Sequence, residues 1–326
     1  MYETIRWGIL GTGNIAHQFA RGLTALSDAE LAAVGSRSQE SADKFGDEFN
    51  VARRYPTYQA LVNDAEVDAI YVATPHPFHK DNTILALNAG KAVITEKPFA
   101  INASEVQAMI DAAKKNNVFL MEAMWTRFLP AIVRVRELIA EGAIGEPRLV
   151  TADFGFRAGI NPQHRLFNPD LGGGALLDVG IYVMSFASMV FGASDRITGY
   201  ANIGETQIDE QTAFILGYPG GQLAALTTAV RTNTPQEAII NGTDGRIKVH
   251  SPFWCGTKLT LNAKGEDTEI ELPLTGNGYN YQAAEVARCL RAGLTESGTM
   301  PLAESLCIIQ SMDTLRAQWG FKYPME

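Results

Sequence analysis

The chain has 326 residues, longer than one ordinary hydrophobic core supports, so the sequence predicts two domains. Its 27 basic and 36 acidic residues give a formal charge of −9 with no basic cluster, which argues against nucleic acid and anionic membrane as partners and favours a small-molecule ligand. Cys255, Cys289 and Cys307 are odd in number and lack Cys-x-x-Cys spacing, so neither a disulfide framework nor a structural zinc site is expected, and a cytoplasmic, reducing location fits.

The N-terminal stretch Ile5–Ala16 predicts a strand, a tight turn and the start of a helix. An apolar run at 7–10 ends in Gly-x-Gly-x-x-Ala, in which Gly11 allows the turn, Gly13 lets backbone N–H groups approach a pyrophosphate, and Ala16 lets the helix pack closely on the strand. We therefore expect a dinucleotide here; the alternative is a glycine-rich turn without a ligand. Because the strand begins within the first five residues, no signal peptide is expected.

The second predicted strand, Glu30–Gly35, indicates which dinucleotide is bound. NAD-specific sites usually place Asp or Glu after this strand to bind the ribose 2′-hydroxyl, whereas here it ends in Ser36-Arg37-Ser38. A guanidinium can pair with a 2′-phosphate and stack on adenine. NADP is therefore favoured over NAD, and the alternative is a solvated loop arginine.

Further apolar runs predict strands at Val67–Ala73, Ala92–Thr95 and Asn117–Met121. Helical stretches lie between the strands at 41–49, 79–88 and 104–115. This alternation predicts an α/β, doubly wound parallel Rossmann sheet covered on both faces, with ligands at the carboxyl ends of its strands. The residues expected along that rim are Gly11, Arg37, Thr74, Lys97 and Glu122.

Two histidines and a lysine follow these strands. His76 and His79 lie three residues apart and could share a helix face, but no third and fourth metal ligand follows with suitable spacing, so a cofactor-loop or helix-capping role is preferred to zinc. Lys97 follows an apolar strand, between Glu96 and Pro98, at the rim where a cofactor would lie. We favour a functional lysine over a surface Glu–Lys pair, and a cis Lys97–Pro98 bond would orient it.

After a predicted helix at 130–141, strand-like runs follow one another closely, which predicts a large open, mainly antiparallel sheet in an α+β domain. The runs are Arg148–Phe156, Ile197–Ile203, Gln211–Tyr218, Gln222–Arg231, Glu237–Asn241, Arg246–His250, Lys258–Leu261 and Thr268–Leu272. Two helices, 281–292 and 302–318, close the chain. The predicted domains are 1–122, for dinucleotide binding, and 123–326, for substrate binding and dimerisation; whether the last helix packs back on the first domain stays open.

Within the second half, Gly172–Tyr182 begins with three consecutive glycines and contains a carboxyl, Asp178, and a phenol, Tyr182. If the chain is helical from Ala175 onward, Asp178 and Tyr182 are i and i+4 and share one face of an apolar helix, where a carboxylate is costly without a partner. Spacing alone leaves two interpretations equal, a functional pair or an Asp bonded to backbone beside a Tyr at the core edge. The apolar run Val179–Phe191 has 13 residues, too few to span a bilayer, and predicts a buried helix.

Together these motifs resemble, over essentially the whole chain, the glucose–fructose oxidoreductase/inositol dehydrogenase/rhizopine catabolism (Gfo/Idh/MocA) family. The stretches that carry the resemblance are Gly11-x-Gly13-x-x-Ala16, Glu96-Lys97-Pro98, Asp178-x-Gly180-x-Tyr182, Arg6–Gly8, His76–His79, Leu120–Phe128 and Gly173–Tyr182. Many members carry His where Tyr182 stands, so this departure favours the branch of dihydrodiol and xylose dehydrogenases and argues against an inositol substrate.

The resemblance implies an NAD(P)-dependent oxidoreductase that transfers a hydride reversibly between NADP(H) and a hydroxyl-bearing carbon of a sugar, polyol or diol, without a metal. It implies that Lys97 lies beside the nicotinamide and substrate, and that Asp178 and Tyr182 act on the substrate's hydroxyl or carbonyl. Tyr182 would exchange the hydroxyl proton, with Lys97 favouring the phenolate and stabilising the alkoxide. Asp178 would hold the substrate hydroxyl or Lys97 in place.

The residues expected to bind the cofactor are Gly11, Thr12, Gly13, Asn14, Ile15, Ser36, Arg37, Thr74, Pro75, His76, His79, Glu96, Lys97 and Trp125. The residues expected at the substrate are Lys97, Trp125, Phe154, Arg165, Asp178, Tyr182 and Trp254, and His164 beside Arg165 is equally consistent with a solvated residue. The resemblance also implies a homodimer through the open face of the sheet. Two alternatives stay open: a non-catalytic dinucleotide sensor, and a sugar–sugar oxidoreductase that retains its cofactor.

Overall fold

The computed structural model describes residues 3–326, and the described chain forms two compact units. The first contains the chain up to Trp125 together with Thr275–Leu306, and the second contains Thr126–Leu274 together with Cys307–Glu326. The predicted ranges 1–122 and 123–326 therefore differ from the observed units mainly in the place of 275–306. This segment joins the first unit because helix α8 (Tyr279–Arg291) packs on α1 (Asn14–Leu23).

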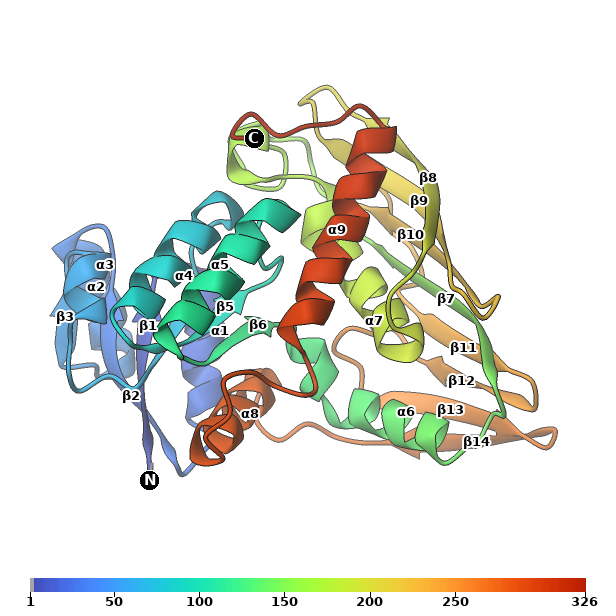
Figure 1. Cartoon of the computed structure of the whole chain (residues 1–326), viewed down its shortest axis with the longest axis horizontal. Helices are drawn as coiled ribbons and strands as arrows, with labels where there is room; N and C mark the ends of the chain where they lie inside the picture. Colours follow the sequence, from blue (N-terminus) through green and yellow to red (C-terminus); the bar gives the residue numbers. More distant parts are fainter. Residues whose placement is uncertain (1–2) are drawn as a thin grey trace. The chain divides into compact units, whose positions relative to one another are not determined.

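Within residues 3–326, six parallel strands form the sheet of the first unit, in the order β3-β2-β1-β4-β5-β6 (Figure 1). The strands are β1 (Ile5–Leu10), β2 (Ala29–Gly35), β3 (Arg53–Tyr55), β4 (Ala69–Val72), β5 (Ala92–Glu96) and β6 (Leu120–Ala123). The helices between them are α1, α2 (Gln39–Phe49), α3 (Tyr58–Val62), α4 (His79–Asn88) and α5 (Ala103–Asn116). The central strands β4 and β5 are buried throughout, as expected for a parallel sheet covered on both faces, and the predicted fold class is confirmed.

Two elements of this unit were missing from the sequence prediction, which placed nothing between the helix at 41–49 and the strand at 67–73. Strand β3 has only three residues, all half-buried, and two of them are the arginines Arg53 and Arg54. Helix α3 is a single short helix whose N-cap, Thr57, accepts a hydrogen bond from the Ala60 N–H. An edge strand this short lacks the apolar alternation on which sequence patterns depend.

In the second unit, within the described chain, eight strands form one sheet in the order β14-β13-β12-β11-β7-β10-β9-β8. The strands are β7 (Pro147–Gly155), β8 (Arg196–Ile203), β9 (Asp209–Gly217), β10 (Leu223–Ala229), β11 (Ala238–Gly242), β12 (Gly245–Val249), β13 (Lys258–Ala263) and β14 (Glu266–Glu271). Only the β7–β10 pair is parallel among them, so the prediction of a mainly antiparallel sheet is confirmed.

The helices of the second unit cover one face of this sheet. They are α6 (Pro130–Ala140), α7 (Ile181–Phe191) and most of α9 (Leu302–Gln318), and α7 packs on β7 and β10 (Figure 1). Side chains alternate accordingly, since Phe214 and Leu216 of β9 are buried whereas Ile215 between them is exposed.

Helix α7 is preceded by a helix of a different kind. Residues Leu176–Gly180 form a π-helix, η4, so the expected continuous α-helix from Ala175 is α-helical only from Ile181. Together with the short helix η3 (Pro169–Leu171) and the glycine turn between them, these helices make a span of 23 residues, Pro169–Phe191, that is long and apolar enough to cross a membrane by length and composition alone. However, 78% of its most apolar window is buried inside the structure, which is the pattern of a core helix and agrees with the predicted buried helix.

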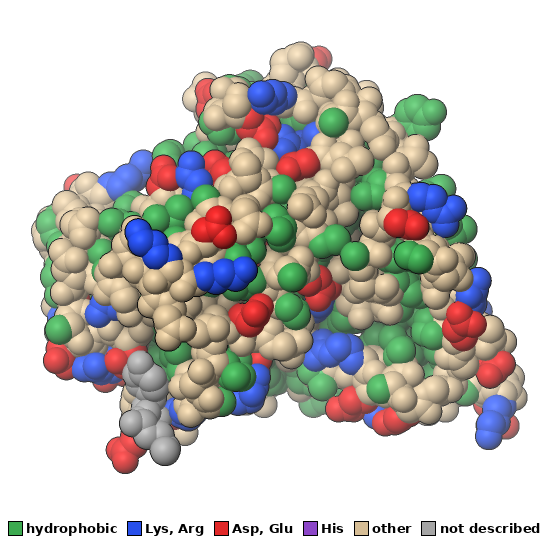
Figure 2. Space-filling model, in the orientation of Figure 1, with side chains coloured by type: hydrophobic (Ala, Val, Ile, Leu, Met, Phe, Trp, Pro, Cys, Tyr) green, Lys and Arg blue, Asp and Glu red, His purple; other side chains and the backbone are tan. Residues whose placement is uncertain are grey.

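On the face drawn in Figure 2, Lys and Arg side chains are interspersed with Asp and Glu side chains, and no large patch of positive charge is visible. This distribution agrees with the formal charge of −9. Nothing on that face has the basic concentration on which binding to a phosphate backbone depends.

Candidate functional site

The turn between β1 and α1 has the geometry that its glycines predict. Gly11 has φ +106°, and a Cβ at this position would lie 2.9 Å from the Ala73 carbonyl oxygen, so only glycine fits beside the end of β4. Gly13 is the exposed N-cap of α1, and in the described chain no side chain caps this helix and no atom comes within 4 Å of a Cβ built on Gly13. The first N–H groups of α1 are thus open to an anion.

The end of β2 lies beside this turn. The Thr12 and Ser36 hydroxyl oxygens are 3.2 Å apart, which joins the β1 and β2 ends directly. The next residue, Arg37, is exposed, and its charge lies close enough to Tyr58 to oppose the rise that burial causes in the pKa of that phenol. No acidic side chain therefore occupies the position that follows β2, where an Asp or Glu would bind a ribose 2′-hydroxyl.

His79 ties the ends of β4 and β5 together. Its side chain is fully buried, with Nδ1 2.8 Å from the Pro98 carbonyl oxygen and Nε2 2.8 Å from the Thr74 carbonyl oxygen. Burial lowers the pKa of His79, against the effect of these carbonyls. Both ring nitrogens are therefore paired with backbone carbonyl oxygens of the protein. His79 contributes to the site by holding the loops that begin at Thr74 and Lys97.

Lys97 lies directly after β5, partly exposed, and the Lys97–Pro98 peptide is cis. The preceding Glu96 is buried and accepts a hydrogen bond from the Tyr71 hydroxyl of β4. Since Glu96 is engaged inside the sheet, it is a support of the Lys97 loop. Glu122 is likewise fully buried, at β6.

Trp125 has an aromatic partner that the sequence did not indicate. Its ring stacks on Tyr279, with ring centroids 4.4 Å apart and planes at 11°. Tyr279 is the first residue of α8 and belongs to the first unit through the segment 275–306. A residue separated by so much of the chain carries no local motif, and only the packing of α8 on α1 reveals it.

In the second unit, Phe154, Tyr182 and Trp254 form one aromatic cluster. Phe154 and Trp254 are stacked at 5.0 Å with planes at 5°, and the Tyr182 ring lies 5.3 Å from Phe154 and 6.1 Å from Trp254. Phe154 and Tyr182 are each 7% exposed, and Trp254 is half-buried. Three residues from β7, from α7 and from the loop after β12 thus form an aromatic wall, in which the Tyr182 ring is tilted by 57° to Phe154 and by 54° to Trp254.

Gln236 holds this wall and is another residue that the sequence did not indicate. It adopts a left-handed backbone conformation with φ +59°, rare for a residue with this side chain. Its amide donates to the Gly155 carbonyl at 2.9 Å, and its amide oxygen lies 3.4 Å from the Trp254 indole nitrogen. The Trp254 carbonyl accepts a hydrogen bond from the Thr126 hydroxyl at 2.7 Å, so Trp254 is fixed at both its ring and its backbone.

Asp178 lies on η4 and forms an ion pair with Arg165. Oδ1 of Asp178 is 2.8 Å from Nη1 of Arg165; the Asp178 side chain is 7% exposed and that of Arg165 is 50% exposed. The partner that a carboxylate on an apolar helix requires is therefore supplied by the loop before the helix. His164, next to Arg165, is exposed, and its ring accepts the Leu166 N–H at 3.3 Å.

The predicted residues form one set in each unit. The set in the first unit stands at the carboxyl ends of the parallel strands, and the set in the second unit surrounds η4 and the start of α7. Among residues 3–326, no three His, Cys, Asp or Glu side chains are grouped as metal ligands. None of the three cysteines forms a disulfide in the part of the chain that the structure describes.

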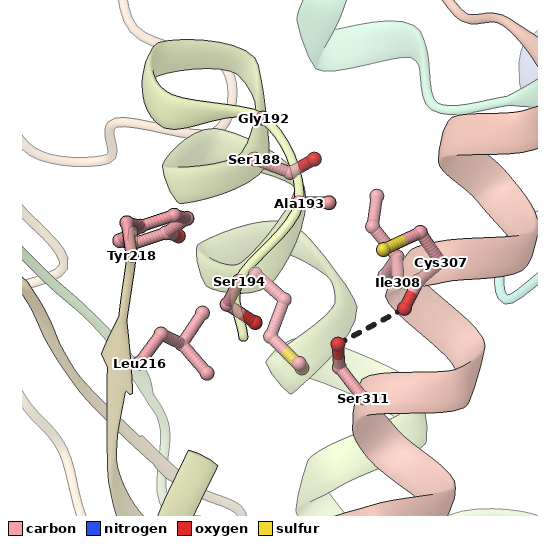
Figure 3. A pocket seen from close by; sticks show the side chains of 10 residues that line it. Ser188, Gly192, Ala193, Ser194, Leu216, Tyr218, Cys307, Ile308 and Ser311 are labelled. Carbon is pink, nitrogen blue, oxygen red and sulfur yellow. Dashed lines mark hydrogen bonds between the residues drawn. The ribbon is translucent and has the colours of Figure 1, made fainter. Parts of the chain in front are cut away.

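A separate small hollow lies in the second unit between α7, β9 and α9 (Figure 3). Its lining includes Tyr218, Ser194, Cys307 and Ser311, and Ser311 donates a hydrogen bond to the Cys307 carbonyl oxygen. None of the predicted site residues lines it. Burial raises the pKa of the Tyr218 phenol well above its usual value, so this hollow offers no ionised group from that side chain.

Comparison with known families divides the chain much as the structure does. Residues 5–124 match a model described as "Oxidoreductase family, NAD-binding Rossmann fold", and residues 132–248 match the "GFO/IDH/MocA C-terminal domain". These matches agree with the resemblance drawn from the motifs.

Curated relatives are similar over their full length. The trans-1,2-dihydrobenzene-1,2-diol dehydrogenases of Mus musculus and Danio rerio are 39% and 40% identical to this chain over 334 residues, which is 99% of this chain and 99% of each relative. The human enzyme of the same name is 36% identical with the same coverage. The branch indicated by Tyr182 is thereby confirmed.

Solved structures share the whole fold. An aldose–aldose oxidoreductase from Caulobacter crescentus, complexed with glycerol, has a TM-score of 0.87 and 26% identity, covering 95% of this chain and 96% of that one. A 3-ketoreductase from Actinomadura kijaniata, in complex with NADP and TDP-benzene, has a TM-score of 0.84 and 25% identity, covering 96% and 97%.

Proposed function

The chain belongs to the Gfo/Idh/MocA family of NAD(P)-dependent oxidoreductases, and from this premise we propose that it transfers a hydride between NADP(H) and a CH–OH carbon of a diol, sugar or polyol. The observation that carries the proposal is in the second unit, where the Tyr182 phenol lies beside the stacked rings of Phe154 and Trp254, and Asp178 lies four residues before it on the adjoining helix η4. A sensor that only binds a dinucleotide needs no such set.

The residues present fit a nicotinamide dinucleotide. Gly13 leaves the N-terminus of α1 uncapped by any described side chain, and this end of the helix suits a pyrophosphate. Arg37, exposed after β2, suits the 2′-phosphate of NADP better than the 2′-hydroxyl of NAD. When bound, the nicotinamide supplies or accepts the hydride.

We assign three roles to the protein's own side chains. Tyr182 exchanges the proton of the substrate hydroxyl, Lys97 stabilises the negative charge that develops on the substrate oxygen, and Asp178 orients the hydroxyl. The aromatic wall of Phe154, Tyr182 and Trp254 suits an apolar ring in the substrate, and the dihydrobenzenediol in the relatives' name is one such ring.

The proposal is tested by Lys97→Met and Tyr182→Phe, with NADPH absorbance followed over a panel of dihydrodiols, aldoses and polyols. Each variant should lower kcat by about 10²–10⁴-fold, the usual range for loss of a positioned acid or base. Lys115→Met, on an exposed lysine, and Tyr281→Phe, on a half-buried tyrosine of α8, are matched controls and should retain activity. Turnover within about tenfold of the parent in both catalytic variants would exclude these roles.

A second function is favoured by one observation, the similarity to an aldose–aldose oxidoreductase. A sugar–sugar oxidoreductase would reduce one sugar while oxidising another and would keep its dinucleotide throughout. Purified protein that carries about one equivalent of nucleotide per chain, and that turns over two sugars without added cofactor, would establish this function in place of the first.

We further propose a homodimer through the outer face of the second sheet. Five large apolar side chains are exposed on its strands: Leu149, Tyr200, Ile203, Ile215 and Leu223. Cross-strand pairing joins Leu149, Leu223 and Ile215 into a stripe. Leu223 of β10 pairs with Leu149 of β7, and Ala225, two residues along β10 on the same face as Leu223, pairs with Ile215 of β9. Sedimentation of the native chain and of Ile215→Glu tests this, the substitution shifting dimer to monomer.

The absence of disulfides among the described cysteines supports a cytoplasmic location for the enzyme.

A further inference from the structure

The turn that leads into η4 is built around a buried carboxyl that the proposed mechanism does not use. Asp209, the first residue of β9, is 0% exposed, and its Oδ2 accepts a hydrogen bond from the Leu176 N–H at 2.6 Å. Ala175, which precedes η4, provides no capping side chain. Asp209 therefore takes the place of a helix cap, supplied from another strand rather than from the chain just before the helix.

The glycines of this turn make room for that carboxyl. Gly174 has φ +122°, and a Cβ there would lie 2.1 Å from Oδ1 of Asp209. A Cβ on Gly173 would lie 2.7 Å from the carbonyl oxygens of both Arg165 and Leu166. The turn is thus packed between Asp209 on one side and, on the other, the loop whose Arg165 pairs with Asp178.

The end of the chain closes the same turn. Tyr323 is 1% exposed, and its hydroxyl donates a hydrogen bond to the Gly173 carbonyl oxygen at 2.8 Å. The Arg316 guanidinium of α9 lies 5.0 Å from the centre of the Tyr323 ring and pairs with Asp313 and Glu326. We call Asp209 and Tyr323 the turn clamp.

Electrostatics couple the clamp to Asp178. Burial raises the pKa of Asp209 to about 7, against the opposing effects of the Leu176 N–H and of the Arg316 charge. Burial also raises the pKa of Tyr323 well above its usual value, and the charges of Asp209 and of Asp178 both add to this rise. The Tyr323 hydroxyl therefore lies within the field of the clamp carboxyl and of the proposed catalytic carboxyl. The charged groups that act on the turn clamp are Arg316, which opposes the rise in the pKa of both Asp209 and Tyr323, and Glu326 and Asp178, which add to the rise in the pKa of Tyr323. Arg316 pairs with Asp313 and Glu326, and Asp178 pairs with Arg165.

We propose that Asp209 and Tyr323 are positioning residues that fix the Gly172–Gly174 turn and thereby the direction in which Asp178 and Tyr182 meet the substrate. The inference rests on the proposed function, because it concerns the geometry of that site. A π-helix is a rare, one-turn structure, so the rotation of its side chains depends on how its first residues are held. Displacement of reacting groups by about 1 Å can cost about 10²-fold in rate.

The test compares Asp209→Ala with Asp209→Asn in the full-length chain. Asp209→Ala removes the acceptor of the Leu176 N–H and should lower kcat by about tenfold or more, with the dissociation constant of NADPH within about twofold of the parent. Asp209→Asn keeps an acceptor and should restore kcat to within about threefold, while the ionisation near neutral pH disappears from the pH profile of kcat. A purely structural role would lower the melting temperature and leave kcat per folded molecule and its pH profile unchanged.

Tyr323→Phe keeps the ring beside Arg316 and removes only the hydrogen bond to Gly173, so it carries the test if Asp209→Ala does not fold. A threefold or larger fall in kcat is expected, which corresponds to about 0.7 kcal/mol in the activation free energy. Glu210→Gln, the same kind of change one residue along β9, is the matched control. Unchanged kcat in Asp209→Ala and Tyr323→Phe would overturn the inference. If Tyr182→Phe is inactive in the same assay, unchanged kcat in the two clamp variants refutes the turn clamp and leaves the proposed function standing. If Tyr182→Phe is active, the proposed function itself is refuted.

Discussion

In the first unit, the candidate residues follow their own strands and are held largely by neighbouring strand ends, whereas in the second unit the Asp178 helix depends on distant parts of the chain. Thr12 meets Ser36 across adjacent strands, and His79 bridges the loops that begin at Thr74 and Lys97. Around η4, by contrast, the partners are separated by 13, 33 and 150 residues: Arg165 with Asp178, Asp209 with Leu176, and Tyr323 with Gly173. A local motif therefore specifies the first arrangement, while the second requires the whole fold.

The largest difference between the two units is expected when one methyl group is added to a glycine in each of them. Gly174→Ala forces a side chain into φ +122° and against Asp209, so we expect a loss of about 3 kcal/mol or more in the free energy of unfolding, or failure to fold. Gly13→Ala meets no described atom within 4 Å and should leave stability nearly unchanged while weakening NADPH binding by blocking close approach. Thermal unfolding and NADPH titration separate the two; equal loss of stability in both would contradict the contrast.

The second prediction concerns pH and the buried carboxyl of the second unit. Because the pKa of Asp209 is about 7 in the folded chain, against an ordinary value of 3.8 for a solvated Asp, the folded state binds the proton more tightly than the unfolded state does. The free energy of unfolding should therefore fall between about pH 4 and pH 7, with a slope of up to about 1.4 kcal/mol per pH unit from this group, and the contribution is constant above that range. Asp209→Asn should remove this part of the slope in denaturant unfolding at several pH values. Parallel curves for parent and variant would show that Asp209 does not titrate in this range.

A smaller and purely local effect is expected in the first unit. Arg37 is exposed, so Arg37→Ala should leave the melting temperature within error while raising the KM for NADP about tenfold and that for NAD by less than about twofold. Initial rates with each dinucleotide provide the measurement. An equal change for both cofactors would remove Arg37 from 2′-phosphate recognition.

The smallest expected effect concerns Gln236, which supports the aromatic wall in the second unit. Gln236→Leu removes the side-chain hydrogen bonds to Gly155 and Trp254 and keeps a similar volume, so the aromatic wall should loosen without loss of the acid and base. We expect KM for the substrate to rise about fivefold with kcat within about twofold, on the order of 1 kcal/mol of binding. Steady-state kinetics test this split; a fall in kcat with constant KM would place Gln236 in the chemical step.

The same contrast explains what could be predicted from the sequence. All the strands of both sheets except β3 follow from apolar runs and turn residues. Gly11, Gly13 and the residues after β2, β4 and β5 follow from the rule that ligands bind at the carboxyl ends of parallel strands. Strand β3 escaped because three half-buried residues carry no period. The π-helical geometry of Leu176–Gly180 was not predicted, because no side-chain pattern distinguishes it from an α-helix.

Supporting residues were the hardest to predict. Tyr279, Gln236, Asp209 and Tyr323 matter through contacts across long stretches of chain, and nothing local marks them. The three consecutive glycines before Ala175 were a signal of crowding, yet the side chain that crowds them could be identified only from the fold. The geometry of a site therefore depends on residues that a motif search does not include.

The chain's indole rings are divided evenly between the two units. Trp7 and Trp125 lie in the first, against Phe19 and Tyr279, and Trp254 and Trp319 lie in the second, where Trp254 stacks on Phe154 and the Trp319 indole donates to the Gly199 carbonyl oxygen. Replacing either pair with phenylalanine would leave intrinsic fluorescence that reports one unit alone. Loss of order around the dinucleotide turn and loss of order around the Asp178 helix could then be followed as separate optical signals in a single denaturation experiment.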